Sequence, residues 1–498
     1  MSTRTPAPTG TTGRLRADLA ATDVVVRHFG RTLVDVPRLH LQPHRPLTVV
    51  GESGSGKSLL AHALMGTLAP ELEVTGAMRV GEASFDLADR RGRRRLWGRE
   101  LALLPQEPVL ALDPTMRVRQ QVAEGAAGWP ADRRGALRGA DERLDGLGLA
   151  HAAGAYPHRL SGGMAQRVAY AAATIGGAHV LVVDEPSKAL DRPAVDRLAD
   201  LLLAHAAAGG LLLTITHDLR LARALGGDAW VMRDAAVVEA GPGEEVLERP
   251  STDYARALTG ADPARWSRRW PTVHPAGTGP SGPGVEPGVE PGVEPVVEGR
   301  DLRKAYGDQC LFAGLDVTIR AGERWALTGP SGAGKTTLGD VLLGLTPADG
   351  GRLRRADRAA GRLQKLYQDP ALSFPRRVPV ALSVDDTARR HGVDPARVAM
   401  LVEQVGLSPD LLGRRPDQVS GGELQRVAVV RAMLTRPVLL LADEATSRLD
   451  LLTQQVTVEA LMGQVVEDGC GLIVVTHDEA LAGALTEHRI TLGDDPRR

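Results

Sequence analysis

Two short stretches decide how this chain folds: GESGSGKS at Gly51–Ser58 and GPSGAGKT at Gly329–Thr336. Each matches the pattern GxxxxGK followed by Ser or Thr, and each comes directly after a short apolar run, LTVV or WALT. Glycines at this spacing let successive backbone N–H groups converge on a phosphate at the start of a helix. The pattern therefore predicts a strand, a phosphate-binding loop and a helix, in that order, twice.

The glycine loops belong to a longer internal repeat. LSGGMAQR, which begins at Leu160, returns as VSGGELQR from Val419, and VLVVDE returns as LLLADE. TITHD, which contains His217, returns as VVTHD with His477. The motifs keep their order in both copies, so we interpret the chain as a duplicated domain in which strands and helices alternate, an α/β fold.

The loops also indicate a chemistry. Lys57 and Lys335 are expected to reach the β- and γ-phosphate oxygens of a nucleotide, and the hydroxyls of Ser58 and Thr336 to coordinate Mg²⁺. A single such match has a simpler interpretation as a chance turn, but two matches in register argue against chance.

Acidic pairs follow two further apolar runs of the kind that form buried parallel strands. Asp184 and Asp443 end these runs and suit a carboxylate that binds Mg²⁺ directly or through water. Glu185 and Glu444 come next, where a base can polarise an attacking water. An isolated acidic pair is more often a strand-ending turn, and it is the glycine loops that favour the functional interpretation.

Composition excludes several classes of protein. The chain has 498 residues, of which 43% are hydrophobic, enough for more than one folded domain. Its 60 basic and 61 acidic residues nearly cancel, which disfavours a protein that coats a polyanion. Cys310 and Cys470 are too few for a disulfide framework, and no uncharged apolar run is long enough to span a membrane. We therefore expect a water-soluble chain in a reducing compartment.

Together these motifs resemble the ATP-binding cassette (ABC) ATPases over nearly the whole chain. The most specific feature is SGG followed by QR, found from Ser161 to Arg167 and from Ser420 to Arg426. SGG at a helix start is a second anion-binding site, and in this family it closes on the γ-phosphate held by the opposite domain. The resemblance implies two phosphate-loop domains, each with a parallel-sheet core, an antiparallel β subdomain and a helical subdomain.

The resemblance also implies site residues. The implied catalytic residues are Glu185, His217, Glu444 and His477, and the implied metal ligands are Ser58, Gln106, Asp184, Thr336, Gln368 and Asp443. Nucleotide contacts are implied for the glycine loops, the Q-loop glutamines, the SGG motifs, the D-loop aspartates and two aromatic residues that stack on adenine. In the first copy these are Phe29, Gly51, Glu52, Ser53, Gly54, Ser55, Gly56, Lys57, Ser58, Leu59, Gln106, Ser161, Gly162, Gly163 and Asp191. In the second copy they are Tyr306, Gly329, Pro330, Ser331, Gly332, Ala333, Gly334, Lys335, Thr336, Thr337, Gln368, Ser420, Gly421, Gly422 and Asp450.

Three further segments make the resemblance specific to one branch of the family. LWGRELALLPQEPVLALDP around Gln106, LQKLYQDPALSFPRRVPV around Gln368 and ERPSTDYARALTGADP from Glu248 are similar to the cassettes of peptide, nickel and related solute importers. The last segment resembles that branch's post-cassette extension. It lacks the cysteines that often follow there, so no iron–sulfur cluster is implied.

The resemblance implies ATP and Mg²⁺ as cofactors and ATP hydrolysis coupled to transport as the activity. The implied partners are two membrane permease subunits and an extracytoplasmic substrate-binding protein, with no nucleic acid, and the two domains pair within the chain. The protein is then cytoplasmic and peripheral on the inner face of the cell membrane, which it touches only through the permease. The resemblance does not distinguish among peptides, nickel and related small solutes as the cargo. Export is a lesser alternative to import.

A soluble twin-cassette ATPase that acts on ribosomes or DNA is the competing hypothesis. Such translation factors typically have a long charged linker and the continuation EPTNHLD after the acidic strand. Here the continuations are EPSKALD and EATSRLD, and the linker is rich in proline and glycine. Transport is therefore the favoured hypothesis.

The predicted domains are a disordered leader at 1–18, a first ABC ATPase domain with its C-terminal extension at 19–270, a linker at 271–295 and a second ABC ATPase domain at 296–498. The linker holds three tandem PGVE units from Pro283 to Glu294, a composition with little means of forming a core. The linker is expected to be long enough to let the two domains face one another and to have no chemical role of its own.

Overall fold

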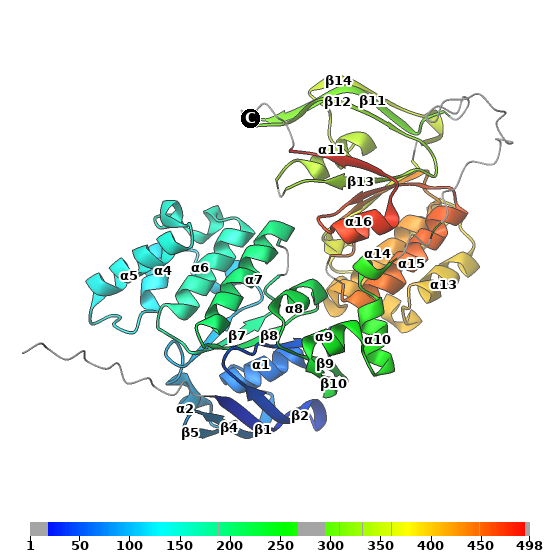
Figure 1. Cartoon of the computed structure of the whole chain (residues 1–498). Helices are drawn as coiled ribbons and strands as arrows, with labels where there is room; N and C mark the ends of the chain where they lie inside the picture. Colours follow the sequence, from blue (N-terminus) through cyan, green and yellow to red (C-terminus); the bar gives the residue numbers. More distant parts are fainter. Residues whose placement is uncertain are drawn as a thin grey trace, which may run out of the picture. The chain divides into compact units, whose positions relative to one another are not determined.

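The computed structural model describes residues 18–187, 190–266, 270, 294–307, 309–330, 332–359, 361–447 and 449–493 (Figure 1). The predicted leader and linker lie outside these ranges except for Asp18, Glu294 and Pro295, and the predicted site residue Ser331 also lies outside them. The chain divides into two compact units, Met1–Thr259 and Gly260–Arg498. The units are described one at a time.

The first unit is built on one ten-stranded sheet with the order β5-β4-β1-β2-β10-β9-β3-β8-β7-β6. Its antiparallel part contains β1 (Leu19–His28), β2 (Arg31–Leu41), β4 (Glu73–Val80) and β5 (Ala83–Asp86). Its largely parallel part contains β3 (Leu47–Val50), β6 (Leu101–Leu104), β7 (Val180–Asp184), β8 (Leu211–Ile215), β9 (Asp228–Arg233) and β10 (Ala236–Pro242). The two parts meet at one short pairing, Ala236 with Asp35.

The helices of the first unit follow the strands in the order that the repeat predicts. They are α1 (Lys57–Met65), α2 (Arg90–Arg94), α3 (Pro108–Ala111), α4 (Val118–Glu124), α5 (Arg133–Gly146), α6 (Gly162–Thr174), α7 (Arg192–Ala207), α8 (Leu219–Leu225), α9 (Gly243–Glu248) and α10 (Asp253–Gly260). Short 3₁₀ turns lie at Ala150–Ala152 and Pro157–Arg159.

The second unit repeats the parallel core with the same strand order. A five-stranded sheet has the order β15-β16-β17-β13-β18, which matches β6-β7-β8-β3-β9 of the first unit. Its strands are β13 (Arg324–Thr328), β15 (Leu363–Leu366), β16 (Leu439–Asp443), β17 (Gly471–Val475) and β18 (His488–Thr491). A separate three-stranded antiparallel sheet contains β11 (Val297–Tyr306), β12 (Gln309–Ile319) and β14 (Gly350–Arg355).

Its helices are α11 (Lys335–Leu343), α12 (Val380–Arg390), α13 (Pro395–Gln404), α14 (Gly421–Leu434), α15 (Leu451–Glu467) and α16 (Glu479–Leu485). Its 3₁₀ turns are η3 (Pro263–Arg265), η4 (Asp357–Ala359), η5 (Pro370–Ser373), η6 (Pro409–Gly413) and η7 (Pro416–Gln418). In the ranges that the structure describes, no helix is both long enough and apolar enough to cross a membrane.

The apolar runs of the sequence form strands because both of their faces are covered. Every residue of β3, β7, β8, β16 and β17 is buried. Parallel strands need such continuous apolar sequence, since helices pack on both sides of the sheet. The predicted α/β fold is therefore confirmed, with a parallel core in each copy and with antiparallel strands that join the same sheet in the first unit and form a separate sheet in the second.

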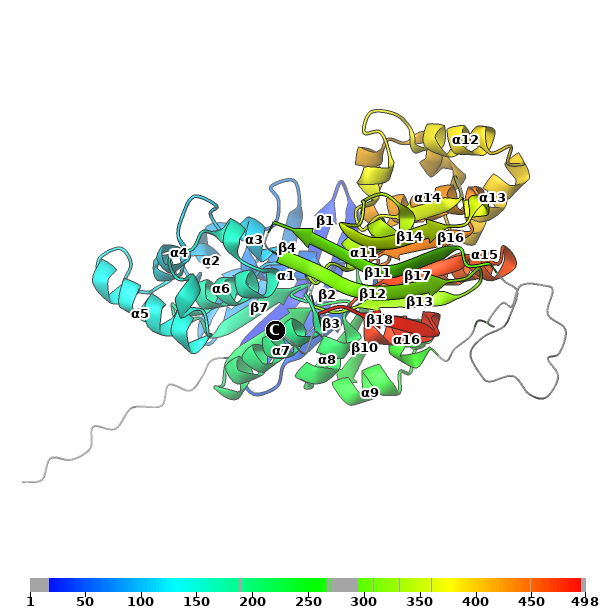
Figure 2. The same cartoon turned by 90° about the horizontal axis from the view of Figure 1, so that it is seen from above.

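The helix that follows each glycine loop is the central layer of its copy. In the second unit, Leu338 and Leu342 of α11 share a buried cluster with Val297 and Ile319 of the antiparallel sheet and with Leu441 of the parallel sheet. Figure 1 shows α11 between these two sheets, and Figure 2 shows the same layers from above, where they overlap. In the first unit, α1 shares a buried cluster with β1, β2, β7 and β8. Burial on both sides holds the start of each helix, and hence its glycine loop, in place.

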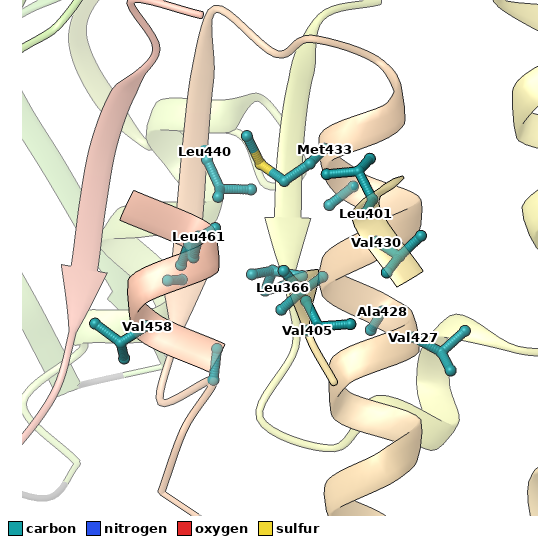
Figure 3. Packing of buried hydrophobic residues seen from close by; sticks show 14 of the residues in the cluster. Leu366, Leu401, Val405, Val427, Ala428, Val430, Met433, Leu440, Val458 and Leu461 are labelled. Atoms are coloured by element: carbon teal, nitrogen blue, oxygen red, sulfur yellow. The ribbon is translucent and has the colours of Figure 1, made fainter. Parts of the chain in front are cut away.

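The opposite face of the parallel sheet carries the helical part of each copy. In the second unit one cluster joins Leu366 of β15 and Leu440 of β16 to Met433 of α14 and Leu461 of α15, as Figure 3 shows. In the first unit, α4, α5 and α6 enclose a cluster of their own. The SGG motif at the start of α6 or α14 is thus positioned by helices that also pack on the core.

The residues just after α10 pack within the second unit. Trp266 follows η3 and is only 7% exposed, in the buried cluster that also contains Leu481 and Leu485 of α16. The ring of Trp266 meets the ring of Trp270 edge-on, with centroids 6.4 Å apart. The compact second unit thus begins at Gly260, before the predicted start of the second domain, and the predicted domain boundaries stay predictions.

Candidate functional site

Four of the predicted site motifs in each copy lie at one edge of its parallel sheet. In the first unit, Gly51 follows β3, Gln106 follows β6, Asp184 ends β7 and His217 follows β8. These four strands are consecutive neighbours and run parallel, so their carboxyl ends meet at the same edge. The second unit repeats the arrangement at β13, β15, β16 and β17.

The first glycine of each loop must be glycine. At Gly51, with φ 152°, an added Cβ would lie 2.2 Å from the carbonyl oxygen of Met232. At Gly329, with φ 135°, it would lie 2.3 Å from the carbonyl oxygen of Leu492. Both distances are too short for any side chain, so the loop packs its backbone directly on β9 in the first copy and on the residue just after β18 in the second. This close packing turns the loop toward the helix start.

The loop lysines are buried and bonded to their own loops. Lys57 Nζ donates to the carbonyl oxygens of Gly51 at 2.8 Å and Glu52 at 2.6 Å. Lys335 Nζ donates to the carbonyl oxygens of Gly329 and Pro330, both at 2.9 Å. Each ammonium therefore lies over the loop, where an anion can replace the carbonyls as its partner.

A hydroxyl and a carboxylate meet beside each loop. Ser58 Oγ donates to Asp184 Oδ1 at 2.9 Å, and Thr336 Oγ1 donates to Asp443 Oδ1 at 3.0 Å. Both carboxylates are largely buried, and burial raises the pKa of Asp184. Hydroxyl and carboxylate oxygens are the ligands that Mg²⁺ prefers, and Mg²⁺ usually takes few protein ligands because phosphates and water complete its shell. The residues present therefore fit Mg²⁺ in both copies.

In the first copy, the glutamate after the acidic strand forms a short ion pair with the predicted histidine. His217 Nδ1 lies 2.6 Å from Glu185 Oε2, and the His217 backbone N–H donates to the same oxygen at 3.2 Å. Burial acts to raise the pKa of Glu185, but the His217 side chain lowers it overall. Burial likewise acts to lower the pKa of His217, but the Glu185 carboxylate raises it overall. Each partner thus favours the charged form of the other.

The second copy adds a third member to this contact. His477 Nδ1 lies 3.5 Å from Glu444 Oε1, while Gln368 Nε2 donates to Glu444 Oε2 at 2.6 Å. The hydrogen bond with His477 lowers the pKa of Glu444 and raises that of the histidine. In the first copy, Gln106 is exposed just after β6, at the position that matches Gln368.

Both glutamates share an unusual backbone. Glu185 has φ 45° and Glu444 has φ 47°, in the left-handed region that a residue with a side chain rarely adopts. In each case the backbone N–H bonds to the neighbouring strand, Glu185 to Ile215 at 2.8 Å and Glu444 to Val475 at 2.9 Å. Such strain typically accompanies functional positions, and here it aims the carboxylate at the histidine.

The SGG motifs begin helices, as predicted. Ser161 is the N-cap of α6 and Ser420 the N-cap of α14, each accepting the N–H of the third helical residue at 3.3 Å. The predicted D-loop aspartates also cap helices, Asp191 at the start of α7 and Asp450 at the start of α15. An N-cap alone explains an aspartate at these positions, so the nucleotide role of Asp191 and Asp450 stays a prediction.

The two aromatic residues predicted to stack on adenine lie at equivalent strand turns. Phe29 is 93% exposed between β1 and β2, and Tyr306 is 56% exposed at the end of β11. Neither ring has a role in the core, which leaves both available to a ligand. Lys304 Nζ lies 5.2 Å from the centre of the Tyr306 ring.

The structure adds residues that the sequence analysis missed. Lys365 lies beside Asp443 in the second copy, and His62 Nε2 lies 3.8 Å from Asp184 Oδ2 in the first. Tyr254 on α10 accepts the N–H of Glu52 at 3.3 Å, so the post-cassette extension contacts the first glycine loop. Burial raises the pKa of Tyr254 to about 12, so its hydroxyl stays protonated. The sequence could have drawn attention to Lys365 as a site residue, because lysine is rare in this chain. Nothing in the sequence around Tyr254 predicts its contact with the glycine loop, because that contact forms only when the extension packs against the loop.

Comparison with known proteins agrees with this geometry. The family described as ABC transporter matches residues 34–188 and 312–447. The peptidoglycan transport ATP-binding protein YejF of Agrobacterium fabrum (strain C58 / ATCC 33970) is 31% identical, over 92% of this chain and 87% of that protein. The glutathione import ATP-binding protein GsiA of Escherichia coli (strain K12) is 31% identical, over 91% of this chain and 80% of that protein.

Solved structures share the twin-unit fold at lower identity. RNase-L Inhibitor has a TM-score of 0.65 and 20% identity, over 95% of this chain and 88% of that chain. The archaeal ribosome recycling factor aABCE1, solved in complex with the ribosomal stalk protein aP1, has a TM-score of 0.66 and 20% identity over the same shares. At this level of identity the likeness concerns the fold alone.

Proposed function

The chain belongs to the ABC transporter family of ATPases, and on this premise we propose that it energises the uptake of a small peptide-like solute through separate permease subunits. ATP binding and ATP hydrolysis follow from the family itself. The observation that carries the transport proposal is that relatives similar to more than nine-tenths of this chain, at 31% identity, are named as transport or import ATP-binding proteins.

The choice of a peptide-like cargo over nickel rests on the cargoes that those relatives' names give. Peptidoglycan and glutathione both contain amino acids joined by amide bonds. We propose a cargo of this chemical class. The proposal includes two membrane permease subunits, an extracytoplasmic substrate-binding protein, pairing of the two cassettes within the chain, and peripheral association with the membrane through the permease.

In the proposed mechanism, each glycine loop binds the phosphates of ATP. Lys57 exchanges its two loop carbonyls, 2.8 and 2.6 Å away, for phosphate oxygens, and Lys335 does the same in the second copy. The exposed rings of Phe29 and Tyr306 stack on adenine. Ser58 with Asp184, and Thr336 with Asp443, would hold Mg²⁺, which when bound neutralises charge that develops on the phosphate oxygens.

The glutamate that follows each acidic strand acts as the base. Glu185 is held ionised by His217, so it can accept a proton from the attacking water. Glu444 is placed in the same way by His477 and by Gln368. The imidazole keeps the carboxylate oriented and lies where it can approach a γ-phosphate. Because both copies keep both groups, we propose that both sites hydrolyse ATP.

A reconstitution experiment tests the proposed function. The chain is co-expressed with candidate permease and receptor subunits, and uptake of radiolabelled glutathione, a short peptide and Ni²⁺ is measured in proteoliposomes. We expect ATP-dependent uptake of a peptide-like compound and ATP hydrolysis that the loaded receptor stimulates. The double variant Lys57→Ala with Lys335→Ala is the matched control and should abolish both.

Two results would contradict the proposal. Uptake of Ni²⁺ alone would refute the peptide-like cargo. Failure to associate with any permease, together with sedimentation on ribosomes and ATP hydrolysis stimulated by ribosomes, would favour the competing soluble twin-cassette function.

A further inference from the structure

A tyrosine of the post-cassette extension holds one peptide unit of the first glycine loop. Tyr254 lies on α10, and its hydroxyl accepts the backbone N–H of Glu52 at 3.3 Å. The carbonyl of the same peptide unit belongs to Gly51, and it accepts a hydrogen bond from Lys57 Nζ at 2.8 Å. Because the C=O and N–H of a trans peptide point in opposite directions, the lysine and the tyrosine hold this unit from opposite sides.

Tyr254 is itself fixed by the strands next to the loop. The guanidinium carbon of Arg233, the last residue of β9, lies 4.8 Å from the centre of the tyrosine ring. The preceding residue, Met232, provides the carbonyl oxygen on which Gly51 packs. Glu239 of β10 accepts two backbone N–H groups just before α10. The hydroxyl therefore reaches the loop from a helix that is fixed at its start.

The residue at the matching position of the second loop cannot donate. Pro330 stands where the first loop has Glu52, and proline has no backbone N–H. The lysine contacts are the same, because Lys335 Nζ donates to the carbonyl oxygens of Gly329 and Pro330, both at 2.9 Å. The proline ring restricts its own φ and packs beside Gly493, where an added Cβ would lie 3.2 Å from the ring Cδ. The same point of the loop is thus restrained by a hydrogen bond in the first copy and by a covalent ring in the second.

We infer that Tyr254 is a positioning residue for ATP binding at the first site, and that Pro330 has the matching role at the second. The inference rests on the proposed function, in which Lys57 leaves the carbonyl of Gly51 for the phosphates. The peptide unit then loses one of its two partners when ATP binds, and Tyr254 keeps the other in place. The loop thereby keeps the shape that its phosphate-binding N–H groups need. Tyr254 touches no nucleotide in this account and acts through the loop.

Tyr254→Phe tests the role of the hydroxyl, because the variant keeps the ring and its contact with Arg233. Equilibrium binding of a radiolabelled non-hydrolysable ATP analogue measures each site in the full chain. The first site is measured in the Lys335→Ala background and the second in the Lys57→Ala background. We expect the dissociation constant to rise on the order of twofold to tenfold at the first site, the usual range for one hydrogen bond. The dissociation constant at the second site should not rise.

A proline in the first loop separates this role from simple packing. In a chain that carries Glu52→Pro, the loop has no N–H at this position, so the further change Tyr254→Phe should not weaken binding of the analogue. The matched control is Glu52→Ala, which also removes the carboxylate but keeps the N–H. In that background Tyr254→Phe should still weaken binding at the first site.

Pro330→Ala tests the second half of the inference. The variant removes the ring that restricts the backbone of the second loop, so it should weaken binding of the analogue at the second site. It keeps the comparison between the two loops decisive if Glu52→Pro fails to fold.

The outcomes separate the inference from the proposed function. An unchanged dissociation constant in Tyr254→Phe would overturn the role of the hydroxyl. An equal rise in the Glu52→Pro background would also overturn it, because the tyrosine would then act only by packing. An unchanged affinity in Pro330→Ala would overturn the matching role of Pro330. No binding of the analogue at either site of the wild-type chain would instead refute the phosphate-binding loops of the proposed function.

Discussion

In the proposed mechanism, Glu185 and Glu444 act as the bases that accept a proton from the attacking water. Both adopt a left-handed backbone and both contact a histidine. Glu185→Gln and Glu444→Gln, made one at a time, should each slow ATP turnover by about 10²- to 10⁴-fold at their own site, the usual cost of removing a general base. Single-turnover hydrolysis in the permease-bound complex measures this. ATP binding is the control and should survive, and wild-type turnover in either variant would mean that its glutamate only ends the strand.

At this scale the sequence predicted the groups that recur in both copies and missed those that do not. Glu185, His217 and their counterparts stand in repeated motifs, so each could be named as a site residue, although their contact with one another was not predicted. Lys365 stands in the run LQKL, which gives no hint of its partners. It meets Asp340 and Asp443 only once β15 lies beside β16 and α11 packs on both. Contacts between residues far apart in the chain therefore had to come from the structure.

Among the elements, α14 has a capping arrangement that α6 lacks. Glu423 Oε2 accepts the Ser420 backbone N–H at 2.9 Å while Ser420 Oγ accepts the Glu423 N–H, which is a capping box. Met164 stands at the matching position of α6. Glu423→Ala should lower the free energy of unfolding of the second unit by about 0.5 to 1 kcal/mol, as for loss of a helix cap. Differential scanning calorimetry measures the change.

Glu423→Gln is the matched control for this prediction. Glutamine can also close a capping box, so this variant should lose less stability than Glu423→Ala. Equal losses in the two variants would show that the charge near the helix start, and not the hydrogen bond, stabilises α14.

The start of α10 depends on a carboxylate whose charge varies with pH. Glu239 of β10 accepts the backbone N–H groups of Ser251 at 2.7 Å and Thr252 at 2.9 Å, and the Thr252 hydroxyl at 2.6 Å. Burial acts to raise the pKa of Glu239, but these hydrogen bonds lower it overall from its ordinary 4.5. The stabilisation is thus present above pH 4.5 and is lost as the pH falls through the lower folded-state pKa.

Glu239→Gln tests this pH dependence. The variant should loosen α10 at pH 7 by about 1 kcal/mol, a value reduced for solvent screening, and the difference from wild type should shrink on acidification below about pH 4. Hydrogen exchange of the α10 amides at several pH values measures it. A difference that does not change with pH would show that shape, not charge, holds the helix.

The elements themselves were predictable where burial dictates composition. LTVV became β3, and the runs before Glu185 and Glu444 became β7 and β16, because strands covered on both faces must be apolar throughout. The polar, partly exposed β5 and the short α2 have no such pattern. Their formation depends on neighbours that only the fold supplies.

For the whole molecule, the linker is predicted to set how far apart the two domains can lie and to have no chemical role. Its PGVE units, apart from their last residue Glu294, lie outside the described residues, so this prediction rests on the sequence. Replacing Pro283 to Glu294 with a flexible spacer of equal length should leave ATP turnover within about twofold of wild type, because only the span matters. Steady-state hydrolysis in the permease-bound complex measures it. A large loss at equal length would show that the repeat binds a partner, whereas progressive shortening should reduce turnover only below a threshold length.

The position of Trp266 limits how this protein can be divided. A gene split within the linker would leave the indole on the first polypeptide, although its buried neighbours Leu481 and Leu485 belong to the second. One product would expose a large aromatic ring, and the other would contain an unfilled space at the edge of α16. A split before Gly260 keeps the ring and its pocket together. Separation of the duplicated gene into two working genes would therefore have to cut inside what looks, from its sequence, like the tail of the first half.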